Sequence, residues 1–174
     1  KTLRLLWLLA LVPVSTFAQG YINFANLAPA VNAPVTNAAT WQRVPAGSTF
    51  LAQLYYGPAG ADMTQLFSVT NAPVGFSIPG FFLGGTCNTD PALVAGGQTA
   101  TFQVRAWEAV LGATWEDAYL NYLSMSVTGA VGFSQLIQVK TAVDASSAAN
   151  LVGLQPFFVD AGTLPEPGTI WLGA

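Results

Sequence analysis

The chain has few charged side chains, and this shortage excludes several classes of protein. Charged residues make up 7% of the 174 residues, whereas hydrophobic residues make up 52%. A typical soluble domain has about 25% charged residues. So few Lys and Arg residues do not suit a nucleic-acid-binding protein, which needs clustered basic groups against phosphates. The high hydrophobicity also argues against intrinsic disorder, which is typical of chains with few apolar residues and high net charge.

Histidine is absent, and cysteine occurs once, at Cys87. The lack of histidine excludes a Ser-His-Asp triad, a zinc site with histidine ligands and a histidine general base. One cysteine excludes an internal disulfide. Cys87 is therefore either a small buried hydrophobic residue or a site of pairing with a second chain. We expect no cofactor.

The first residues have the order of a secretion signal. Two basic residues precede an apolar run at 5–14, and small residues follow it. The run is shorter than the roughly 20 residues that span a bilayer, and a proline near its end disfavours a buried helix. We predict a signal peptide over 1–18, which signal peptidase removes by cutting between Ala18 and Gln19. A cut after Gly20 is the alternative.

Near the other end, Pro165, Glu166 and Pro167 precede an apolar run. Two prolines so close together exclude a helix interior and a central strand, so they predict an extended linker. This end resembles the PEP-CTERM sorting signal, in which Pro-Glu-Pro precedes a short transmembrane helix and a basic cluster. The resemblance implies processing by an exosortase, a membrane enzyme. We assign 161–174 to the linker, the motif and the start of a truncated transmembrane sorting segment.

The middle of the chain is similar to a recurring type of PEP-CTERM protein from Gram-negative bacteria. The resemblance lies in YINFAN at 21–26, FLAQLYYGPAG at 50–60, FQVRAWE at 102–108 and LVGLQPF at 151–157. It implies an exported protein at the cell surface or in the extracellular matrix, associated with exopolysaccharide, and a β-rich architecture. It implies no particular chemistry.

Apolar and polar residues alternate with period two in several segments, which predicts half-buried strands. In 98–108, Phe102 and Val104 lie on one face, with Arg105 and Trp107 on the other. The other predicted strands are 21–24, 49–56, 133–140 and 155–159; within 133–140, Phe133 and Ile137 are expected on the same face. Pro79-Gly80 predicts a bend within 76–83, and 87–97 has the composition of a loop.

One short helix is expected over 114–123, with Thr114 as its N-cap. Two acidic residues follow Thr114 in the first turn, where they favour the helix dipole. We expect the helix to pack Trp115, Tyr119, Tyr122 and Leu123 on a sheet. The whole pattern predicts an all-β fold over 19–160: an antiparallel β-sandwich of immunoglobulin-like or jelly-roll type with one short helix.

The candidate sites favour binding over catalysis. Glu108, Glu116 and Asp117 lie close in sequence, but they occupy a strand end and a helix start, where solvated and capping roles are usual. Calcium prefers oxygen ligands, and the chain offers them at Asp62, Asn88, Asp90, Glu116 and Asp117. No Asp-x-Asp-x-Asp-Gly run is present, and we expect no metal. Exposed aromatic rings stack on sugars, and the candidate ligand contacts are Trp41, Trp107 and Trp115.

Three functions compete for this sequence. The first is a structural or matrix protein without catalysis, which the PEP-CTERM resemblance implies. The second is a carbohydrate-binding module that acts on exopolysaccharide and needs exposed aromatic side chains. The third is a secreted hydrolase, which needs acidic side chains converging in a cleft. We expect the first.

Overall fold

Two long antiparallel strands, β6 (Gly47–Pro58) and β10 (Thr99–Glu108), form the centre of the structure. The computed structural model describes residues 18–69 and 71–162. Four shorter strands extend the pair into a six-stranded sheet. They are β11 (Val131–Phe133) and β12 (Ile137–Lys140), which pair with β10, and β7 (Phe67–Ser68) and β8 (Val74–Phe76), which pair with β6.

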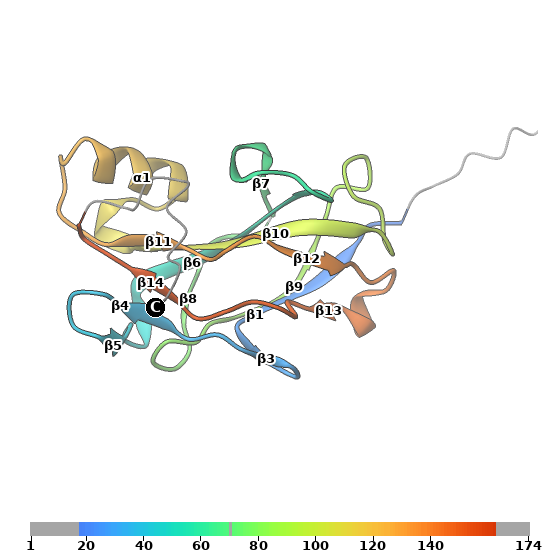
Figure 1. Ribbon diagram of the computed structural model, residues 1–174, viewed down its shortest axis with the longest axis horizontal. Coiled ribbons are helices and arrows are strands. Elements are labelled where there is room, and N and C mark those ends of the chain that lie inside the picture. The colour runs from blue at the N-terminus through green and yellow to red at the C-terminus, as the bar shows by residue number, and fades with distance from the viewer. Residues whose placement is uncertain (1–17, 70, 163–174) are drawn as a thin grey trace, which may run out of the picture.

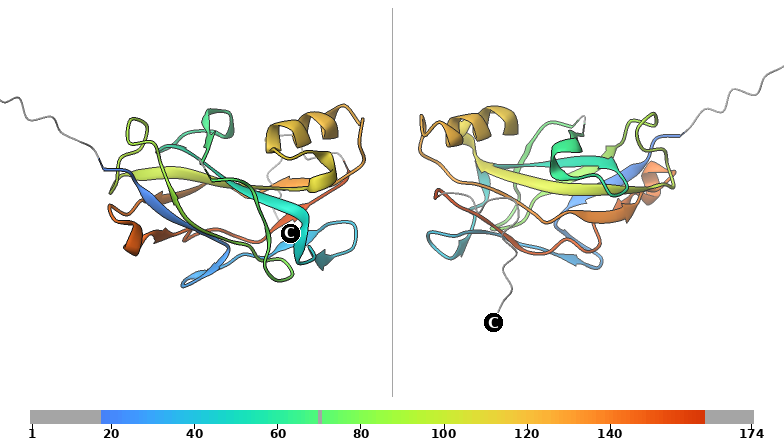
Figure 2. Two further views of the ribbon diagram at one scale, coloured as in Figure 1. Left: turned by 180° about the vertical axis from the view of Figure 1, so that it is seen from behind. Right: turned by 45° about the horizontal axis from the view of Figure 1, so that its top comes forward.

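Smaller sheets form a second layer against one face of the large sheet (Figures 1 and 2). One contains β13 (Ala149–Asn150), β1 (Tyr21–Ala25) and β9 (Leu83–Asn88), and another contains β14 (Phe157–Val159), β4 (Val35–Asn37) and β5 (Gln42–Arg43). β2 (Leu27–Ala28) and β3 (Val31–Asn32) form a two-stranded ribbon. Most pairs are antiparallel, while β1 with β13 and β4 with β14 are short parallel pairs. The all-β, sandwich-like fold predicted from the sequence is confirmed.

The main core lies between the two layers, and the alternation in the sequence predicts which side chains enter it. From β10, Phe102 and Val104 point into this core, while Arg105 and Trp107 lie on the outer face of the sheet, as expected. β6 behaves in the same way. Its inward residues are Phe50, Ala52, Leu54 and Tyr56, and its outward residues include Leu51 and Tyr55.

The predicted strand 133–140 is interrupted, and the expected facing of Phe133 is wrong. Phe133 pairs with Arg105 and packs on the outer face, whereas Ile137 pairs with Phe102 and enters the main core. A bulge at Ser134 inserts one extra residue between these two pairs, and an insertion of one residue moves the next side chains to the opposite face. The Ser134 hydroxyl accepts a hydrogen bond from the backbone of Val104 at 3.0 Å and holds the bulge against β10.

The two layers are hydrogen-bonded to each other along the side of the large sheet formed by β11 and β12. Val131 in β11 exchanges two backbone hydrogen bonds with Asp160, of 3.0 and 2.9 Å, just after β14. Ala142, just after β12, does the same with Tyr21 of β1, at 3.0 and 2.9 Å. The edge of the large sheet is therefore covered by these contacts rather than left open to pairing with another chain.

The helix α1 (Trp115–Leu123) lies on the outer face of the large sheet, as Figure 1 shows. Thr114 is its N-cap, as predicted, and accepts a hydrogen bond from the backbone of Asp117 at 3.2 Å. The side chains of Trp115 and Ala118 are buried on the face of the helix that meets the sheet. Leu123 is exposed, so the expectation that Leu123 packs on the sheet is wrong. Three short 3₁₀ helices occur in the connections: η1 (Met63–Gln65), η2 (Ala109–Leu111) and η3 (Ala145–Ser147).

The bend predicted at Pro79-Gly80 is confirmed, and it carries the chain from β8 in the large sheet to β9 in the second layer. Asn26, which is fully buried, fixes this bend through its side chain. Its amide donates to the carbonyls of Ala33 at 2.8 Å and Gly80 at 2.9 Å, and it accepts from the backbone of Phe82 at 2.8 Å. The predicted loop 87–97 begins later than expected, because Cys87 and Asn88 belong to β9.

Candidate functional site

The most exposed tryptophan among the described residues is Trp41, in the turn between β4 and β5. Trp41 is 78% exposed, and its indole meets the ring of Phe158 on β14 at a centroid distance of 5.5 Å and an interplanar angle of 74°. Phe158 is itself 49% exposed. The two rings stand nearly perpendicular, and we call this pair the aromatic corner.

The turn that presents Trp41 is held by Asn37. The Asn37 side-chain oxygen accepts from the backbone of Ala39 at 2.9 Å and of Thr40 at 3.4 Å, and its carbonyl accepts from the backbone of Trp41 at 2.9 Å. Trp41 has a φ of 58°, in the left-handed region that glycine and asparagine usually occupy. Such a conformation in a bulky residue costs about 1 to 3 kcal/mol and clusters at functional sites.

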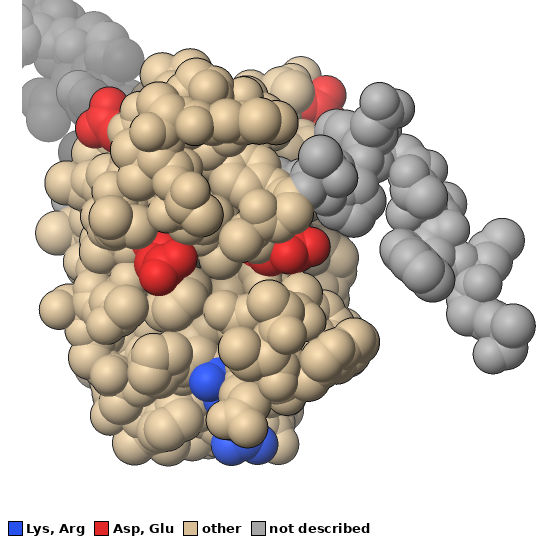
Figure 3. All heavy atoms as spheres, turned by 90° about the vertical axis from the view of Figure 1, so that its left-hand side faces the viewer, with Lys and Arg blue, Asp and Glu red and all other residues tan. Residues whose placement is uncertain are grey.

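The surface around the aromatic corner is polar but weakly charged. Thr40 and Gln42 flank Trp41 and are exposed. Arg43, two residues after Trp41, is also exposed, and its guanidinium carbon lies 4.9 Å from the ring centroid of Phe81. Figure 3 shows the side of the molecule on which α1 and β5 lie in Figure 1, and most of that face carries neither acidic nor basic side chains.

The prediction that Trp107 and Trp115 contact a ligand is wrong, because both side chains are buried. They form a second core between the large sheet and α1, with ring centroids 6.0 Å apart. The indole N–H of Trp107 donates to the carbonyl of Gly112 at 2.9 Å. Trp107 lies on the outer face of β10, which the sequence predicts, but the helix that covers that face makes it inaccessible to a ligand.

A buried polar cluster lies beside this second core. Arg105 donates from Nε to Gln103 at 3.0 Å and from a terminal nitrogen to the carbonyl of Met63 at 2.9 Å. Its guanidinium carbon lies 3.9 Å from the ring centroid of Tyr55 and 5.5 Å from that of Trp115. Trp107 shares the outer face of β10 with Arg105, but the rings that lie against the guanidinium are those of Tyr55 and Trp115.

Tyr55 connects this cluster to α1. Its hydroxyl donates to the carboxylate of Glu116 at 2.7 Å. Burial raises the pKa of Tyr55, and the hydrogen bond from its hydroxyl to Glu116 raises it further. Burial lowers the pKa of Arg105, while the nearby groups of Tyr55 and Glu116 act in the opposite direction. These hydrogen bonds and ring contacts join β6, β10 and α1, and the role of the cluster is to fasten the helix to the sheet.

The three acidic residues weighed as catalytic groups point to separate partners. Glu108 accepts from the backbone of Ala130 at 3.1 Å, Glu116 accepts from Tyr55, and Asp117 accepts from the Thr114 hydroxyl at 2.9 Å. Hydrogen bonds from Thr64 lower the pKa of Asp62, which caps η1. Within residues 18–69 and 71–162, no group of three His, Cys, Asp or Glu side chains could hold a metal ion.

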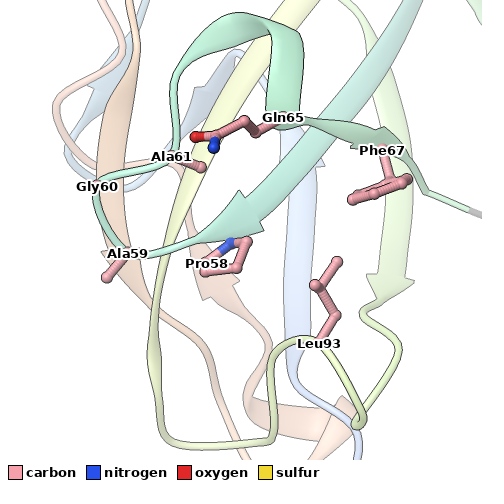
Figure 4. Close-up of a pocket in the computed structure, with 7 residues that line it drawn as sticks. All are labelled: Pro58, Ala59, Gly60, Ala61, Gln65, Phe67 and Leu93. Carbon is pink, nitrogen blue, oxygen red and sulfur yellow. The ribbon is translucent and has the colours of Figure 1, made fainter.

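A shallow hollow of about 420 Å³ lies beside the end of β6 (Figure 4). Small and apolar residues line it, with Gln65 as the one side chain that carries an amide. The Gln65 oxygen already accepts from the backbone of Asp62 at 3.0 Å. The hollow thus lacks the converging polar groups that fix a small ligand. Its lining residues are Pro58, Ala59, Gly60, Ala61, Gln65, Phe67 and Leu93.

Cys87 is buried in the main core, where it packs as a small hydrophobic residue. Burial raises the pKa of its thiol to about 11. The thiolate is the reactive form of cysteine. In the folded chain, Cys87 is therefore neither accessible to a second chain nor ionised at neutral pH, which favours the first of the two roles considered for it.

The processing sites lie at and beyond the limits of the described residues. Gln19 forms a β-bridge with Ala95, and the carbonyl of Ala18 accepts from the backbone of Gly96 at 2.7 Å. Pro165, Glu166 and Pro167 lie outside the described residues. In the part of the chain that the structure describes, no helix has both the length and the apolar character needed to cross a bilayer.

The fold and the aromatic corner define a β-sandwich-like protein with an aromatic surface site. No protein-family model matches the chain, and neither a curated protein nor a solved structure matches it. Phe158 and Asn37 are site residues that sequence reasoning missed. Phe158 becomes recognisable only when β4 and β14 are placed side by side, whereas the local signal for Asn37 is that an asparagine side chain bonds backbone amides two and three residues further on.

Proposed function

We propose that this chain is an exported, non-catalytic protein of the surface or extracellular matrix of a Gram-negative bacterium, processed by signal peptidase and an exosortase. The observation that carries the proposal is that the predicted signal peptide precedes, and the Pro-Glu-Pro motif follows, the described strands in the chain. The described hydrogen-bonded strands and bridges run from Gln19 to Asp160. Cuts before Gln19 and within 165–167 leave those bridges intact.

The contacts of the first described residues favour the cut between Ala18 and Gln19. A cut after Gly20 would remove the bridge between Gln19 and Ala95. It would also remove the hydrogen bond from the Gly20 backbone to the Thr89 hydroxyl, of 3.0 Å, which is buried. The preferred cut removes the carbonyl of Ala18 and leaves both of these contacts in place. We therefore expect Gln19 as the first residue of the mature protein.

A structural role is supported by the acidic side chains, which form hydrogen bonds within the fold. Glu108, Glu116 and Asp117 hold three different parts of the fold together. The exposed surface is instead rich in large apolar side chains, such as Trp41 and Phe158. A charge-poor surface with exposed aromatic rings suits contact with a polymer in a matrix.

Cell fractionation tests this proposal. The protein with a complete C-terminal sorting segment is expressed in a Gram-negative host with and without its exosortase, and the mature N-terminus is sequenced. We expect a leaderless protein beginning at Gln19, released to the surface only where the exosortase is present. Glu166→Ala should retain the protein in the membrane fraction, whereas Thr169→Ala, outside the motif, should not. A cytosolic protein with its leader attached would contradict the proposal.

A further inference from the structure

The aromatic corner formed by Trp41 and Phe158 is not explained by the folding of the chain. Trp107 and Trp115 are buried and contribute to the second core, whereas Trp41 is 78% exposed. Its left-handed backbone adds an energetic cost to this exposure. Neither the exposure nor the conformation stabilises the fold, so both are consistent with selection for contact with a ligand.

The backbone that carries both rings is held in place before any ligand arrives, and the rings contact each other. Trp41 is fixed by the Asn37 turn, and Phe158 sits on β14, whose residue register pairs Phe158 with Thr36 of β4. Both rings are thus attached to one hydrogen-bonded sheet, β14-β4-β5. A preorganised pair of rings loses little conformational freedom on binding, which favours affinity.

The surroundings of the corner indicate what it binds. A membrane or an apolar protein partner needs a broad apolar patch. Here the residues beside Trp41 are Thr40 and Gln42, which are exposed and offer a hydroxyl and an amide. The basic group nearest in sequence, Arg43, is stacked on Phe81. Two exposed rings, one of them on a turn where the adjacent residues in sequence are uncharged and polar, fit a ring that is apolar on its faces and polar at its edge, which describes a pyranose.

We infer that Trp41 and Phe158 form a binding subsite for a neutral polymer of hexoses with equatorial hydroxyl groups. The indole of Trp41 stacks on the C–H face of one pyranose, and Phe158 flanks the same sugar from the side. Thr40 and Gln42 lie beside Trp41 to bond the sugar hydroxyls. This inference deepens the surface role proposed above, but binding is measured on purified protein and does not depend on export or sorting.

Affinity electrophoresis of the purified protein tests the subsite. Gels contain hydroxyethyl cellulose, a neutral glucan, or alginate, an anionic polymer. We expect retardation by the neutral polymer and none by alginate. Trp41→Ala should weaken the apparent affinity about tenfold or more, Phe158→Ala less, and Trp41→Phe should retain part of it because an aromatic face remains.

The matched control is Phe67→Ala. Phe67 is an exposed aromatic residue, 57% accessible, on another part of the surface, and its removal should leave the retardation unchanged. Near-ultraviolet circular dichroism of each variant shows whether the fold is preserved. Wild-type protein that the neutral glucan does not retard would overturn the inference, as would a folded Trp41→Ala variant retarded like wild type. A Trp41→Ala variant that loses self-association instead would identify a protein interface and also overturn it.

Discussion

At the scale of single residues, Arg105 shows how a chain with very few charges uses one of them inside the fold. Its guanidinium is buried, stacked on Tyr55 and hydrogen-bonded to Gln103 and to the carbonyl of Met63. A planar group with several donors satisfies these partners together, which the ammonium group of a lysine does not. The charge is therefore part of the packing rather than a surface feature.

Arg105→Lys should lower the free energy of unfolding by about 2 kcal/mol, because the stack on Tyr55 and a hydrogen bond to a buried acceptor are lost. Urea denaturation followed by fluorescence measures the change. Arg43→Lys is the control, since Arg43 also stacks on an aromatic ring but is exposed, and it should change the free energy by less than about 0.5 kcal/mol. Equal effects of the two substitutions would contradict the role given to Arg105.

Tyr55 makes the stability depend on alkaline pH. Burial, and then the hydrogen bond to Glu116, raise the pKa of Tyr55 above its ordinary value of 10.0. Between pH 10 and the folded-state pKa, the unfolded chain loses a proton that the folded chain keeps, so the free energy of unfolding falls as pH rises. Below pH 10 the contribution is constant.

Tyr55→Phe should lower stability at pH 7 by about 1 kcal/mol, through loss of the hydrogen bond, and should also reduce the decline between pH 10 and pH 11. Urea denaturation at pH 7, 10 and 11 compares the variant with the wild type. A variant that keeps the whole alkaline decline would show that other groups cause it.

At the scale of elements, the bulge at Ser134 decides which side chains of the β11–β12 segment enter which core. Ser134 supplies a hydroxyl that accepts from the backbone of Val104 and donates to the carbonyl of Gln135 at 2.9 Å. The bulge thereby directs Phe133 toward the helix and Ile137 toward the main core. One hydroxyl thus supports the register of a whole edge of the large sheet.

Ser134→Ala should lower the free energy of unfolding by about 2 kcal/mol, because a buried backbone donor of β10 loses its acceptor. Thermal unfolding and urea titration both measure this. Ser126→Ala removes a hydroxyl whose hydrogen bonds are exposed, at the end of α1, and its effect should stay below about 0.5 kcal/mol. If both alanine variants were equally stable, the bulge would not depend on the side chain of Ser134.

At the scale of the whole molecule, the two layers meet most closely where β11 approaches β14. Gly132 lies in β11, and a Cβ atom there would collide with the backbone carbonyl of Phe158. Val131 and Asp160 exchange hydrogen bonds at the same place. Only a residue without a side chain allows this contact between the layers.

Gly132→Ala should therefore separate the layers locally and lower the free energy of unfolding by about 3 kcal/mol or more. Gly60→Ala is the control: Gly60 has a φ of 81° and nothing lies within 4 Å of the position of an added Cβ atom, so only backbone strain of about 1 kcal/mol is added. Differential scanning calorimetry ranks the two variants. A Gly132→Ala protein as stable as wild type would contradict the close contact of the layers.

The sequence by itself determined the local features of this protein. Alternation in 49–56 and 98–108 predicts which residues of β6 and β10 face the core, because a strand turns successive side chains to opposite faces whatever its neighbours are. Thr114 predicts the start of α1, because an N-cap bonds to a backbone amide within its own turn. The bend at Pro79-Gly80 is predicted because proline fixes its own φ and glycine readily adopts a positive φ, here 81°.

Only the tertiary structure decided what depends on segments far apart in the chain. Trp107 and Trp41 are equally plausible ligand contacts in the sequence, but the helix over β10 buries the first and nothing in the described residues covers the second. Phe158 joins the site through its parallel pairing with β4. The bulge at Ser134 and the need for glycine at 132 likewise arise from contacts with other strands. Pairing between distant strands is set by the packing of the whole core, which no local pattern of residues encodes.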